Sequence, residues 1–377
     1  MSNGTYDVII VGAGIVGAAC AYECAQRDMR VAVIDRDVVG GGATGAAMGH
    51  IVVMDDSDAQ FALTRYSQTL WHELRSQLPS EVEYEQCGTI WVAADEIEMA
   101  EVLRKRAYYA RNAVAVEALN SSDLERLEPN LRKGMAGGLL VPEDGVLYPP
   151  RATRFLVDRA LLNGAVLHAG LTVSEIGHGK VHLSDSTSLF AATIVNATGA
   201  WSPALTSGVD VKKRKGHLVI TDRYPGFIRH QLVELGYLKS AHAVSADSVA
   251  FNVQPRKNGQ MLIGSSRQFG AEHKEVDQEI MRHMLQRAQE YLPALAQTSA
   301  IRAWTGFRAA TPDKLPLIGP WPADPSIYLA TGHEGLGIAT SLATARLLAD
   351  QLTGTSSAIP VGPYLPSRIA SLEHANA

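Results

Sequence analysis

The sequence predicts an α/β protein in which a parallel sheet, built from segments far apart in the chain, adjoins a second, α+β domain with a mainly antiparallel sheet. The parallel sheet is predicted by a strand, glycine turn and helix at residues 6–35 and by similar strand-to-glycine exits at Gly199 and Gly332. Strand-like segments with repeated turns at residues 217–263 predict the antiparallel sheet. The length of 377 residues also favours two joined domains, because single cores rarely grow so large.

The segment from Tyr6 to Asp35 carries the first βαβ unit. Two short apolar runs enclose a helical stretch that starts with the spacing G-x-G-x-x-G at Gly12, Gly14 and Gly17. We expect Gly12 to permit the turn, Gly14 to let a pyrophosphate approach the backbone, and Gly17 to let the helix lie close to the sheet. The helix N-terminus favours phosphate, and the Asp35 carboxylate can accept hydrogen bonds from an adenosine ribose. The unit is therefore a Rossmann-like dinucleotide site, in which the charge of Asp35 disfavours the 2′-phosphate of NADP.

Charge and cysteine content narrow the class of protein. The net charge is −5 and the charges are spread along the chain, which argues against a nucleic-acid partner. The three cysteines form neither a C-x-x-C pair nor a disulfide framework, and Cys20 and Cys24 lie one helical turn apart as expected of packing residues. No apolar stretch is long enough for a signal peptide or a membrane span. We expect a cytoplasmic protein without a metal site.

The remaining elements follow from local periodicity. Helices are expected where large apolar side chains recur every three to four positions, or where a helix-start sequence such as Ser121-Ser122-Asp123 precedes an apolar run. These segments are residues 59–78, 96–112, 121–128, 151–163, 277–292 and 338–352. Strands are expected where apolar and polar residues alternate, or where a short apolar run ends in a turn. These segments are residues 82–93, 134–148, 165–176, 180–183, 193–197, 302–310, 315–319 and 326–331.

Residues 40–49 form a loop of small side chains between two ordered elements. Five glycines occur there among alanines and Thr44, and the first bulky side chain is that of Met48. A flexible linker is the plain alternative, but linkers seldom hold such a dense block of small residues between ordered elements. We therefore expect this loop to contact a ligand closely.

Three strand-to-glycine exits recur along the chain, at Gly12, Gly199 and Gly332. Exits so far apart in sequence suggest one large ligand that is held by discontinuous segments. NAD would seldom need the last third of the chain, whereas the longer FAD plausibly would. The pattern therefore favours FAD and an FAD-binding Rossmann-like domain.

Five segments, in a fixed order, support a family resemblance. They are V-G-A-G-I-V-G with the Asp35-Arg36 pair, G-G-G-A-T, N-A-T-G-A-W, G-x-R-x-x-T-P-D-x-x-P-x-I-G from Gly306, and G-H-E-G-L-G. Together they resemble the FAD-dependent D-amino-acid oxidase family, which includes glycine oxidase and sarcosine oxidase. Within that family the chain is similar to the FAD subunits of bacterial D-hydroxyproline dehydrogenase, to proline dehydrogenases, and to the FAD subunit of hydrogen cyanide synthase.

The resemblance implies a set of FAD-binding residues drawn from all five segments and from one further strand. They are Gly12, Gly14, Ile15, Val16, Gly17, Asp35, Arg36, Gly42, Ala43, Thr44, Met48, Gly49, His50, Val173, Ala197, Thr198, Gly199, Trp201, Gly306, Gly332, His333, Glu334, Gly335, Leu336 and Gly337. Within this set the first glycines would hold the pyrophosphate, Asp35 the ribose, and the backbone of Val173 the adenine. Residues 332–337 would lie at the pyrimidine edge of the flavin, where a helix N-terminus stabilises negative charge.

The resemblance also implies a site for the substrate carboxylate. Arg308 stands in the family's carboxylate-binding position, and its planar guanidinium suits two-point binding. The alternative is an arginine in a structural ion pair. We expect no strong protein base, because positioning and desolvation of the amine do most of the work.

Other candidates are less specific. His50 and His333 flank the expected flavin and are catalytic candidates, although either could be a packing histidine. Arg267 could face the pocket, but a solvated surface position is favoured, and Glu334 could contact a ligand or favour a helix N-terminus without one. Two tyrosines are further candidates for the pocket lining: Tyr66 and Tyr237.

We expect a dehydrogenase that oxidises the C–N bond of a small or cyclic amino acid to an imine. The favoured substrate is D-hydroxyproline (cis-4-hydroxy-D-proline) or D-proline, and other subunits with an iron–sulfur centre or a further flavin would accept the electrons. Such partners would be the route to any peripheral association with the inner membrane. Alternatives are a glycine- or sarcosine-type oxidase that uses O2, the glycine-oxidising subunit of hydrogen cyanide synthase, and a non-catalytic FAD-bearing subunit.

The expected domains are discontinuous in sequence. The FAD-binding domain comprises residues 1–80, 146–215 and 303–365. The substrate-binding domain comprises residues 81–145 and 216–302, and residues 366–377 form a tail.

Overall fold

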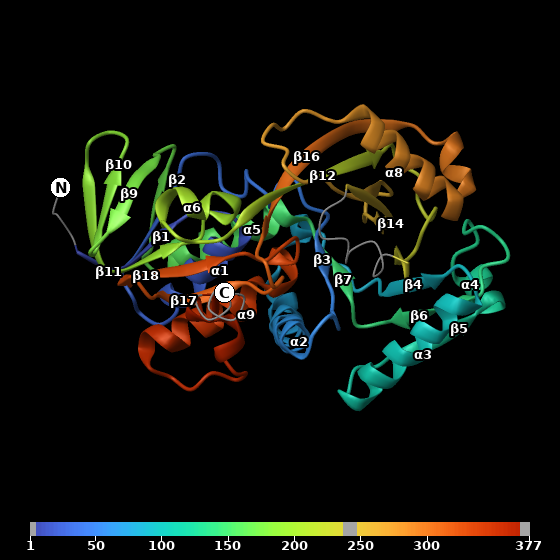
Figure 1. The fold of residues 1–377 in the computed structure, drawn as a ribbon, viewed down its shortest axis with the longest axis horizontal. Coiled ribbons are helices and arrows are strands. Elements are labelled where there is room, and N and C mark those ends of the chain that lie inside the picture. The colour runs from blue at the N-terminus through green and yellow to red at the C-terminus, as the bar shows by residue number, and fades with distance from the viewer. Residues whose placement is uncertain (1–4, 237–246, 370–377) are drawn as a thin grey trace, which may run out of the picture.

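A computed structural model describes residues 5–236 and 247–369 of the chain. Two eight-stranded sheets make up most of it, one on the left of Figure 1 with the chain termini and one on the right. The predicted fold class is confirmed, because a largely parallel sheet adjoins a largely antiparallel one. Helix α2 (Asp58–Leu74) and the small sheet of β3 (His50–Ile51) and β7 (Gly145–Val146) lie between the two sheets.

The first sheet is built from segments spread over the whole chain. Its strand order is β17-β18-β11-β1-β2-β8, parallel throughout except for the edge strand β17, and β9 and β10 extend it through β11. The strands are β1 (Tyr6–Val11), β2 (Val31–Asp35), β8 (Val166–Ala169), β9 (Val173–Gly177), β10 (Lys180–Leu183), β11 (Ser188–Asn196), β17 (Leu317–Trp321) and β18 (Asp324–Thr331). The glycine exits after β1, β11 and β18 lie at the same edge, because neighbouring parallel strands end together.

Apolar side chains fill both faces of this sheet. On one face Val8 and Ile10 pack with the helices α1 (Ile15–Ala25), α5 (Pro149–Leu162) and α9 (Gly337–Thr353). On the other face Ile9 and Val11 pack with residues of β9, β10 and β18. A strand buried on both faces reads as a continuous apolar run, which explains why β1 shows no alternation in the sequence.

The second sheet has the strand order β16-β12-β15-β14-β13-β4-β6-β5, in which only β13 and β4 are parallel. The strands are β4 (Thr89–Ala93), β5 (Glu117–Asn120), β6 (Gly137–Val141), β12 (Lys212–Thr221), β13 (Gln231–Glu234), β14 (Ser248–Pro255), β15 (Met261–Arg267) and β16 (Ala300–Ala310). Helix α8 (Gln278–Tyr291) packs on one of its faces. Helices α3 (Glu96–Arg111) and α4 (Ser121–Leu127) lie near β4, β5 and β6, and α4 starts at a capping box formed by Asn120 and Asp123.

Several element boundaries differ from the sequence prediction. Only residues 89–93 of the predicted strand at 82–93 pair in the sheet, because Ser80–Val82 is a 3-10 turn and Gly88 has a positive φ. The helix predicted at 59–78 ends at Leu74 and continues as the 3-10 turn Arg75–Gln77. Strands β12 and β16 run through the predicted domain boundaries at 215/216 and 302/303, and those boundaries remain a prediction.

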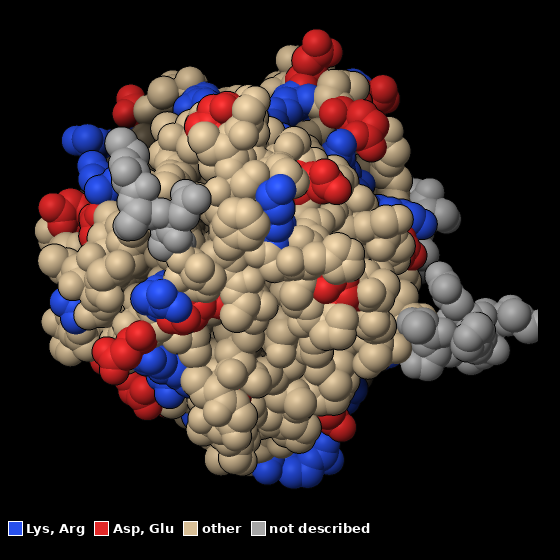
Figure 2. Space-filling model, turned by 90° about the vertical axis from the view of Figure 1, so that its left-hand side faces the viewer, with Lys and Arg blue, Asp and Glu red and all other residues tan. Residues whose placement is uncertain are grey.

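The described part of the chain contains no helix long and apolar enough to cross a membrane. Cys20 and Cys24 are fully buried in α1, as expected of small packing residues. At the end of the molecule formed by the first sheet, Lys and Arg side chains are interspersed with Asp and Glu around a largely uncharged surface (Figure 2).

Candidate active site

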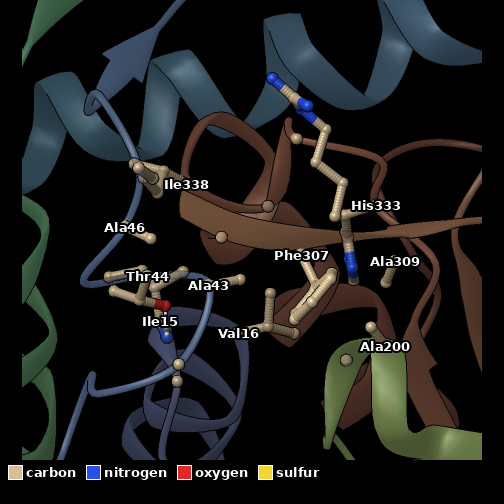
Figure 3. A pocket seen from close by; sticks show the side chains of 18 of the residues that line it. Ile15, Val16, Ala43, Thr44, Ala46, Ala200, Phe307, Ala309, His333 and Ile338 are labelled. Atoms are coloured by element: carbon tan, nitrogen blue, oxygen red, sulfur yellow. Dashed lines mark hydrogen bonds between the residues drawn. The ribbon is translucent and has the colours of Figure 1, made fainter. Parts of the chain in front are cut away.

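One cavity joins the two sheets and collects the predicted ligand-binding segments. Its volume is about 590 Å³, and residues of both sheets line it. Side chains from the start of α1, from the small-residue loop, from Ala200 and from the C-terminal segments surround a common space in Figure 3. The lining segments are residues 11–16, 34–37, 42–50, 171–174, 197–201, 306–309 and 330–338. Tertiary structure therefore brings the three glycine exits to one site.

The turn after β1 has the geometry expected of a dinucleotide site. Gly12 has a φ of +108°, and a Cβ there would stand 2.6 Å from the carbonyl oxygen of Ala197. A Cβ on Gly17 would clash with the carbonyl oxygen of Gly12, so this glycine lets α1 lie against the turn. At Gly14 a Cβ would meet only the hydroxyl of Thr44, at 3.3 Å. That position lines the cavity, where a side chain would take up space next to a bound phosphate.

The N-terminus of α1 fits a pyrophosphate. Its first turn has no acidic residue, and Gly14 supplies no side-chain cap. The hydroxyl of Thr44 accepts a hydrogen bond from the backbone N–H of Ile15 at 3.0 Å, which ties the small-residue loop to the helix start. A helix N-terminus that opens onto a cavity and has no acidic residue in its first turn favours an anionic ligand through its amide groups and its dipole. The residues present therefore fit the phosphates of FAD.

The part of the cavity predicted to hold the adenosine is shaped by residues at the end of β2 and just after it. The carboxylate of Asp35 accepts hydrogen bonds from the backbone N–H groups of Ala13 at 2.6 Å and Asp37 at 2.9 Å. These bonds hold the carboxylate at the cavity wall, and its oxygens retain lone pairs for ribose hydroxyls. The Arg36 guanidinium stacks over Trp201, with 4.9 Å between Cζ and the ring centroid.

The small-residue loop is held against the second sheet. The side-chain amide of Gln254 donates a hydrogen bond to the carbonyl of Met48 at 2.9 Å, and the Trp304 indole N–H donates to the carbonyl of Ala46 at 3.3 Å. A Cβ on Gly306 would stand 2.5 Å from the Cβ of Ala46. Gly306 is therefore needed for close packing of the loop, whether or not it also contacts the cofactor.

The predicted FAD-binding residues line the cavity, with two exceptions. Gly17 packs the helix against the turn, as described above. Gly332 has a φ of +81°, and a Cβ there would stand 2.5 Å from a side-chain carbon of Thr311. Both exceptions shape the backbone beside the cavity. The individual binding roles of the whole set remain predictions.

Arg308 reaches into the same cavity. Its Nη1 donates a hydrogen bond to the carbonyl of Ser266 at 2.8 Å, and its side chain lies over Gly216 and beside Gly335. Its cross-strand neighbour Arg214 forms an ion pair with Glu334. The carboxylate of Glu334 is thus directed to a structural partner, and Arg308 is the arginine next to the start of α9.

The two histidines are neutral at physiological pH. Burial lowers the pKa of His50 to about 4 and that of His333 to about 3. His333 hydrogen-bonds through Nε2 to the hydroxyl of Thr344 at 3.0 Å, which is the packing role weighed above. Nε2 of His50 is buried and has no hydrogen-bond partner among the residues described. His50 is thus able to offer a neutral nitrogen to a ligand, while neither ring supplies a positive charge for a carboxylate.

The less specific candidates from the sequence differ in their position relative to the cavity. Arg267 lines the cavity, so the expectation of a solvated surface residue is wrong. Tyr66 does not line it and packs against the core of the first domain. Tyr237 lies outside the described residues.

Sequence reasoning missed a group of cavity residues on the second sheet. They are Thr89, Trp91, Leu218, Gln231, Val233 and Asn252. The available signal was the alternation of β4, β13 and β14, which places every second side chain on one face. No local pattern shows which face looks toward the cavity.

Two buried charged groups lie directly behind these residues. The Lys105 ammonium is fully buried, pairs with Asp55, and stands 4.4 Å from the centroid of the Trp91 ring. Burial raises the pKa of Asp144 to about 7, against the opposing effect of the Thr89 hydroxyl. Oδ1 of Asp144 accepts hydrogen bonds from the backbone of Val53 at 3.2 Å and from the Gln68 amide at 2.9 Å.

Comparison with known proteins gives a consistent result. The family profile described as FAD dependent oxidoreductase (DAO) matches residues 7–351. The chain is 28% identical to a glycine oxidase of Geobacillus kaustophilus over 96% of this chain and 97% of that protein. It is 27% identical to the hydrogen cyanide synthase subunit HcnC of Pseudomonas aeruginosa over 97% of each.

Solved structures agree with the fold. The crystal structure of glycine oxidase from Geobacillus kaustophilus superimposes with a TM-score of 0.86 at 26% identity, covering 96% of this chain and 98% of that one. The L-proline dehydrogenase of P. horikoshii has a TM-score of 0.86 at 22% identity and covers 97% and 98% of the two chains. At that identity the second likeness concerns the fold alone.

Proposed function

This chain belongs to the FAD-dependent oxidoreductases of the D-amino-acid oxidase family, which act on the C–N bonds of amino acids, and we propose that its substrate is a small cyclic amino acid. The best candidate is cis-4-hydroxy-D-proline, followed by D-proline. The product is the cyclic imine, and the electrons pass to a partner subunit. The protein would act in the cytoplasm, with any membrane association supplied by its partners.

The position of Arg308 is the observation that carries this proposal. Its side chain lines the cavity beside Gly335, within the predicted flavin-binding segment 332–337 that leads into α9. A guanidinium can bind both oxygens of a carboxylate and hold the amino acid in one orientation. The neutral His50 and His333 do not compete for that carboxylate.

The cavity also supports the remaining parts of the reaction. When bound, FAD supplies the two-electron acceptor chemistry. The chain itself positions the substrate through Arg308 and surrounds it with apolar side chains such as Met48 and Leu218. These contacts exclude water from the amine and suit the methylene groups of a ring.

A partner for the electrons is part of the proposal. Iron–sulfur clusters are commonly held by four cysteine thiolates, and this chain has three cysteines. Two of them are buried in α1, so an iron–sulfur acceptor would lie on another chain. The relative HcnC is itself named as a subunit of hydrogen cyanide synthase, which supports an assembly of this kind.

A second candidate is oxidation of glycine or sarcosine, either with O2 or as an HcnC-like subunit. The likeness to proteins named glycine oxidase, at 28% identity over nearly the whole chain, favours it. Hydrogen peroxide formed by the purified protein in air would identify an oxidase. A dehydrogenase would need a dye or a partner.

Anaerobic flavin reduction tests the proposal directly. The FAD-loaded protein is mixed with D- and L-proline, the 4-hydroxyproline epimers, glycine and sarcosine, and bleaching of the flavin absorbance is followed. We expect the fastest reduction with a D-configured ring amino acid. Reduction by glycine alone would replace the proposal with the second candidate, a glycine-oxidising enzyme. If no amino acid reduced the flavin, a non-catalytic subunit would be favoured.

A further inference from the structure

We propose that Trp91, Gln231 and Asn252 form a subsite for an uncharged hydroxyl group on the substrate, on the face of the second sheet that lines the cavity. The proposal rests on the function proposed above and names the residues that would select its substrate. Its evidence is the register of the second sheet, the unpaired polar atoms on it, and the absence of net charge there.

The register places the three side chains on one face of the sheet. Val233 of β13 lies opposite both Trp91 of β4 and Asn252 of β14. Gln231 precedes Val233 by two residues and lies opposite Thr89. Directly opposite residues, and residues two apart on one strand, share a face of a sheet. All of these residues line the cavity, so this face looks into it.

The other face of the same strands is apolar. Ile90, Leu232, Phe251 and Val253 occupy the alternate positions and pack with α8 in a buried cluster. If these strands only had to be buried, apolar side chains would suffice on both faces. The polar side chains occur on the face that meets the cavity, which points to a ligand rather than to folding.

Each of the three subsite side chains has a polar atom without a partner in the part of the chain that the structure describes. Trp91, Gln231 and Asn252 are only 3%, 2% and 8% exposed. Within residues 5–236 and 247–369, the Trp91 indole nitrogen and the side-chain oxygens of Gln231 and Asn252 are buried without a hydrogen-bond partner. Buried polar groups in native proteins are nearly always paired with protein, water or ligand. A substrate group in the cavity would supply the missing partner.

The subsite lies at a suitable distance from Arg308. The guanidinium crosses β12 above Gly216 and donates to the carbonyl of Ser266 on β15. Asn252 lies on the next strand, opposite Gly264, which is two residues from Ser266. One strand spacing and two residue steps amount to on the order of 8 Å between these backbone positions. A small amino acid bound by its carboxylate would therefore extend to the amide, whereas a long side chain would not fit between them.

The charge around the subsite favours a neutral group. The ammonium of Lys105 lies behind the Trp91 ring, but Asp55 pairs with it and offsets its charge. Asp144 lies behind Thr89, and burial raises its pKa to about 7, which favours its neutral form below that pH. The three subsite side chains are themselves uncharged. A second carboxylate or an ammonium on the substrate would lose its hydration there without gaining an opposite charge.

A hydroxyl matches the donors and acceptors that are present. The indole N–H of Trp91 donates only, whereas the two amide side chains both donate and accept. A hydroxyl likewise donates and accepts, so one such group satisfies the indole and an amide together. An unsubstituted ring would leave these atoms unpaired, and sites of this kind discriminate strongly against the analogue that lacks the hydroxyl.

The test compares substrates that differ by one hydroxyl. The FAD-loaded protein is assayed with a dye acceptor on cis-4-hydroxy-D-proline and D-proline, and on D-serine and D-alanine. We expect kcat/KM to favour the hydroxylated member of a pair by about tenfold or more. Asn252→Leu and Gln231→Leu should each bring that ratio toward one, and Trp91→Phe, which removes the indole N–H but keeps an aromatic ring of smaller size, should reduce it.

Gln254→Leu is the matched control. Gln254 is a buried amide on the same strand and face as Asn252, and its side-chain oxygen also has no partner among the described residues. Its side-chain N–H donates to the carbonyl of Met48, and the residue does not line the cavity. Its loss should lower stability and leave the hydroxyl ratio unchanged. An equal fall in the ratio for Gln254→Leu would show that the effect comes from packing, and would overturn the subsite.

A binding measurement separates the subsite from the proposed reaction. Calorimetry compares tetrahydrofuran-2-carboxylate with its 4-hydroxy derivative, which keep the carboxylate and the ring but have no oxidisable amine. Tighter binding of the hydroxylated compound to the wild type, but not to Asn252→Leu, would support the subsite even if ring amino acids failed to reduce the flavin. Equal dissociation constants, or no binding of either compound, would overturn the subsite while leaving the flavin-reduction result to decide the function.

Discussion

The guanidinium of Arg308 lies over Gly216, so closely that a Cβ on Gly216 would stand 2.9 Å from the guanidinium carbon. The two residues are far apart in sequence and lie on the paired strands β16 and β12, where Gly216 is opposite Gly306. The missing side chain lets the arginine extend across β12 to the carbonyl of Ser266. Gly216 thereby controls where the carboxylate-binding group lies.

Gly216→Ala tests that relationship. The added methyl group should displace the guanidinium and raise KM for the amino acid by about tenfold to a hundredfold, because misplaced positioning groups are costly. The FAD absorbance should stay that of the wild type. Gly362→Ala is the control, since a Cβ there would meet nothing within 4 Å. An unchanged KM for Gly216→Ala would mean that Arg308 does not need this position.

Replacement of Arg308 tests the carboxylate site itself. Arg308→Ala should lower kcat/KM for the best substrate by about a hundredfold or more, since a charge-assisted pair is lost, and Arg308→Lys should recover only part of it. Arg302→Lys, on the same strand but exposed, serves as the control. Steady-state kinetics with a dye acceptor give the comparison. Wild-type kcat/KM in Arg308→Ala would remove the carboxylate assignment.

Gly17→Ala should damage the cofactor-binding turn. Its Cβ would clash with the backbone carbonyl of Gly12, and neither α1 nor the turn can move without disturbing the first sheet. We expect a loss of about 1–3 kcal/mol of stability together with weaker FAD retention. Thermal unfolding and the flavin-to-protein absorbance ratio measure both effects. A fully loaded variant of normal stability would contradict the close packing of helix and turn.

His50 should make stability depend on pH in the acid range. Its folded pKa of about 4 lies below the ordinary value of 6.5, so the unfolded chain takes up the proton first as the pH falls. The neutral ring therefore contributes fully above pH 6.5, and its contribution is lost between pH 6.5 and 4, by up to about 3 kcal/mol. Denaturant midpoints across this range, at saturating FAD, should fall less steeply for His50→Gln. Parallel curves would argue against a depressed pKa.

Asp144 should make stability depend on pH in the opposite direction from His50. Its folded pKa of about 7 lies above the ordinary 3.8, so the folded protein holds this proton more tightly than the unfolded chain. Stability from this group is present at low pH and is lost as the pH rises from 3.8 to 7, by on the order of 4 kcal/mol at most. Asp144→Asn should therefore compare more favourably with the wild type at pH 8 than at pH 5. Equal differences at the two pH values would contradict the raised pKa.

Local patterns were sufficient for much of the fold. The turn at Gly12, the helices α1, α3 and α9, and the strand exits at Gly199 and Gly332 follow from glycine positions and apolar spacing, which act over a few residues. The predicted element boundaries were wrong where backbone geometry ends a strand although apolar and polar residues continue to alternate. Gly88, with its positive φ, separates β4 from the stretch before it, in which Glu85 forms an isolated bridge with Val146 of the small sheet.

The sequence by itself determined the cofactor class and pointed to the arginine proposed to bind the carboxylate, because the family's motifs carry both in short, contiguous segments. Tertiary structure alone decided which side chains face the substrate. Trp91, Gln231 and Asn252 come together through the register of β4, β13 and β14, and Gly216 makes room for Arg308 through the pairing of β12 with β16. The physical reason is that cross-strand register depends on long-range pairing and on which face is buried, and neither is encoded by neighbouring residues.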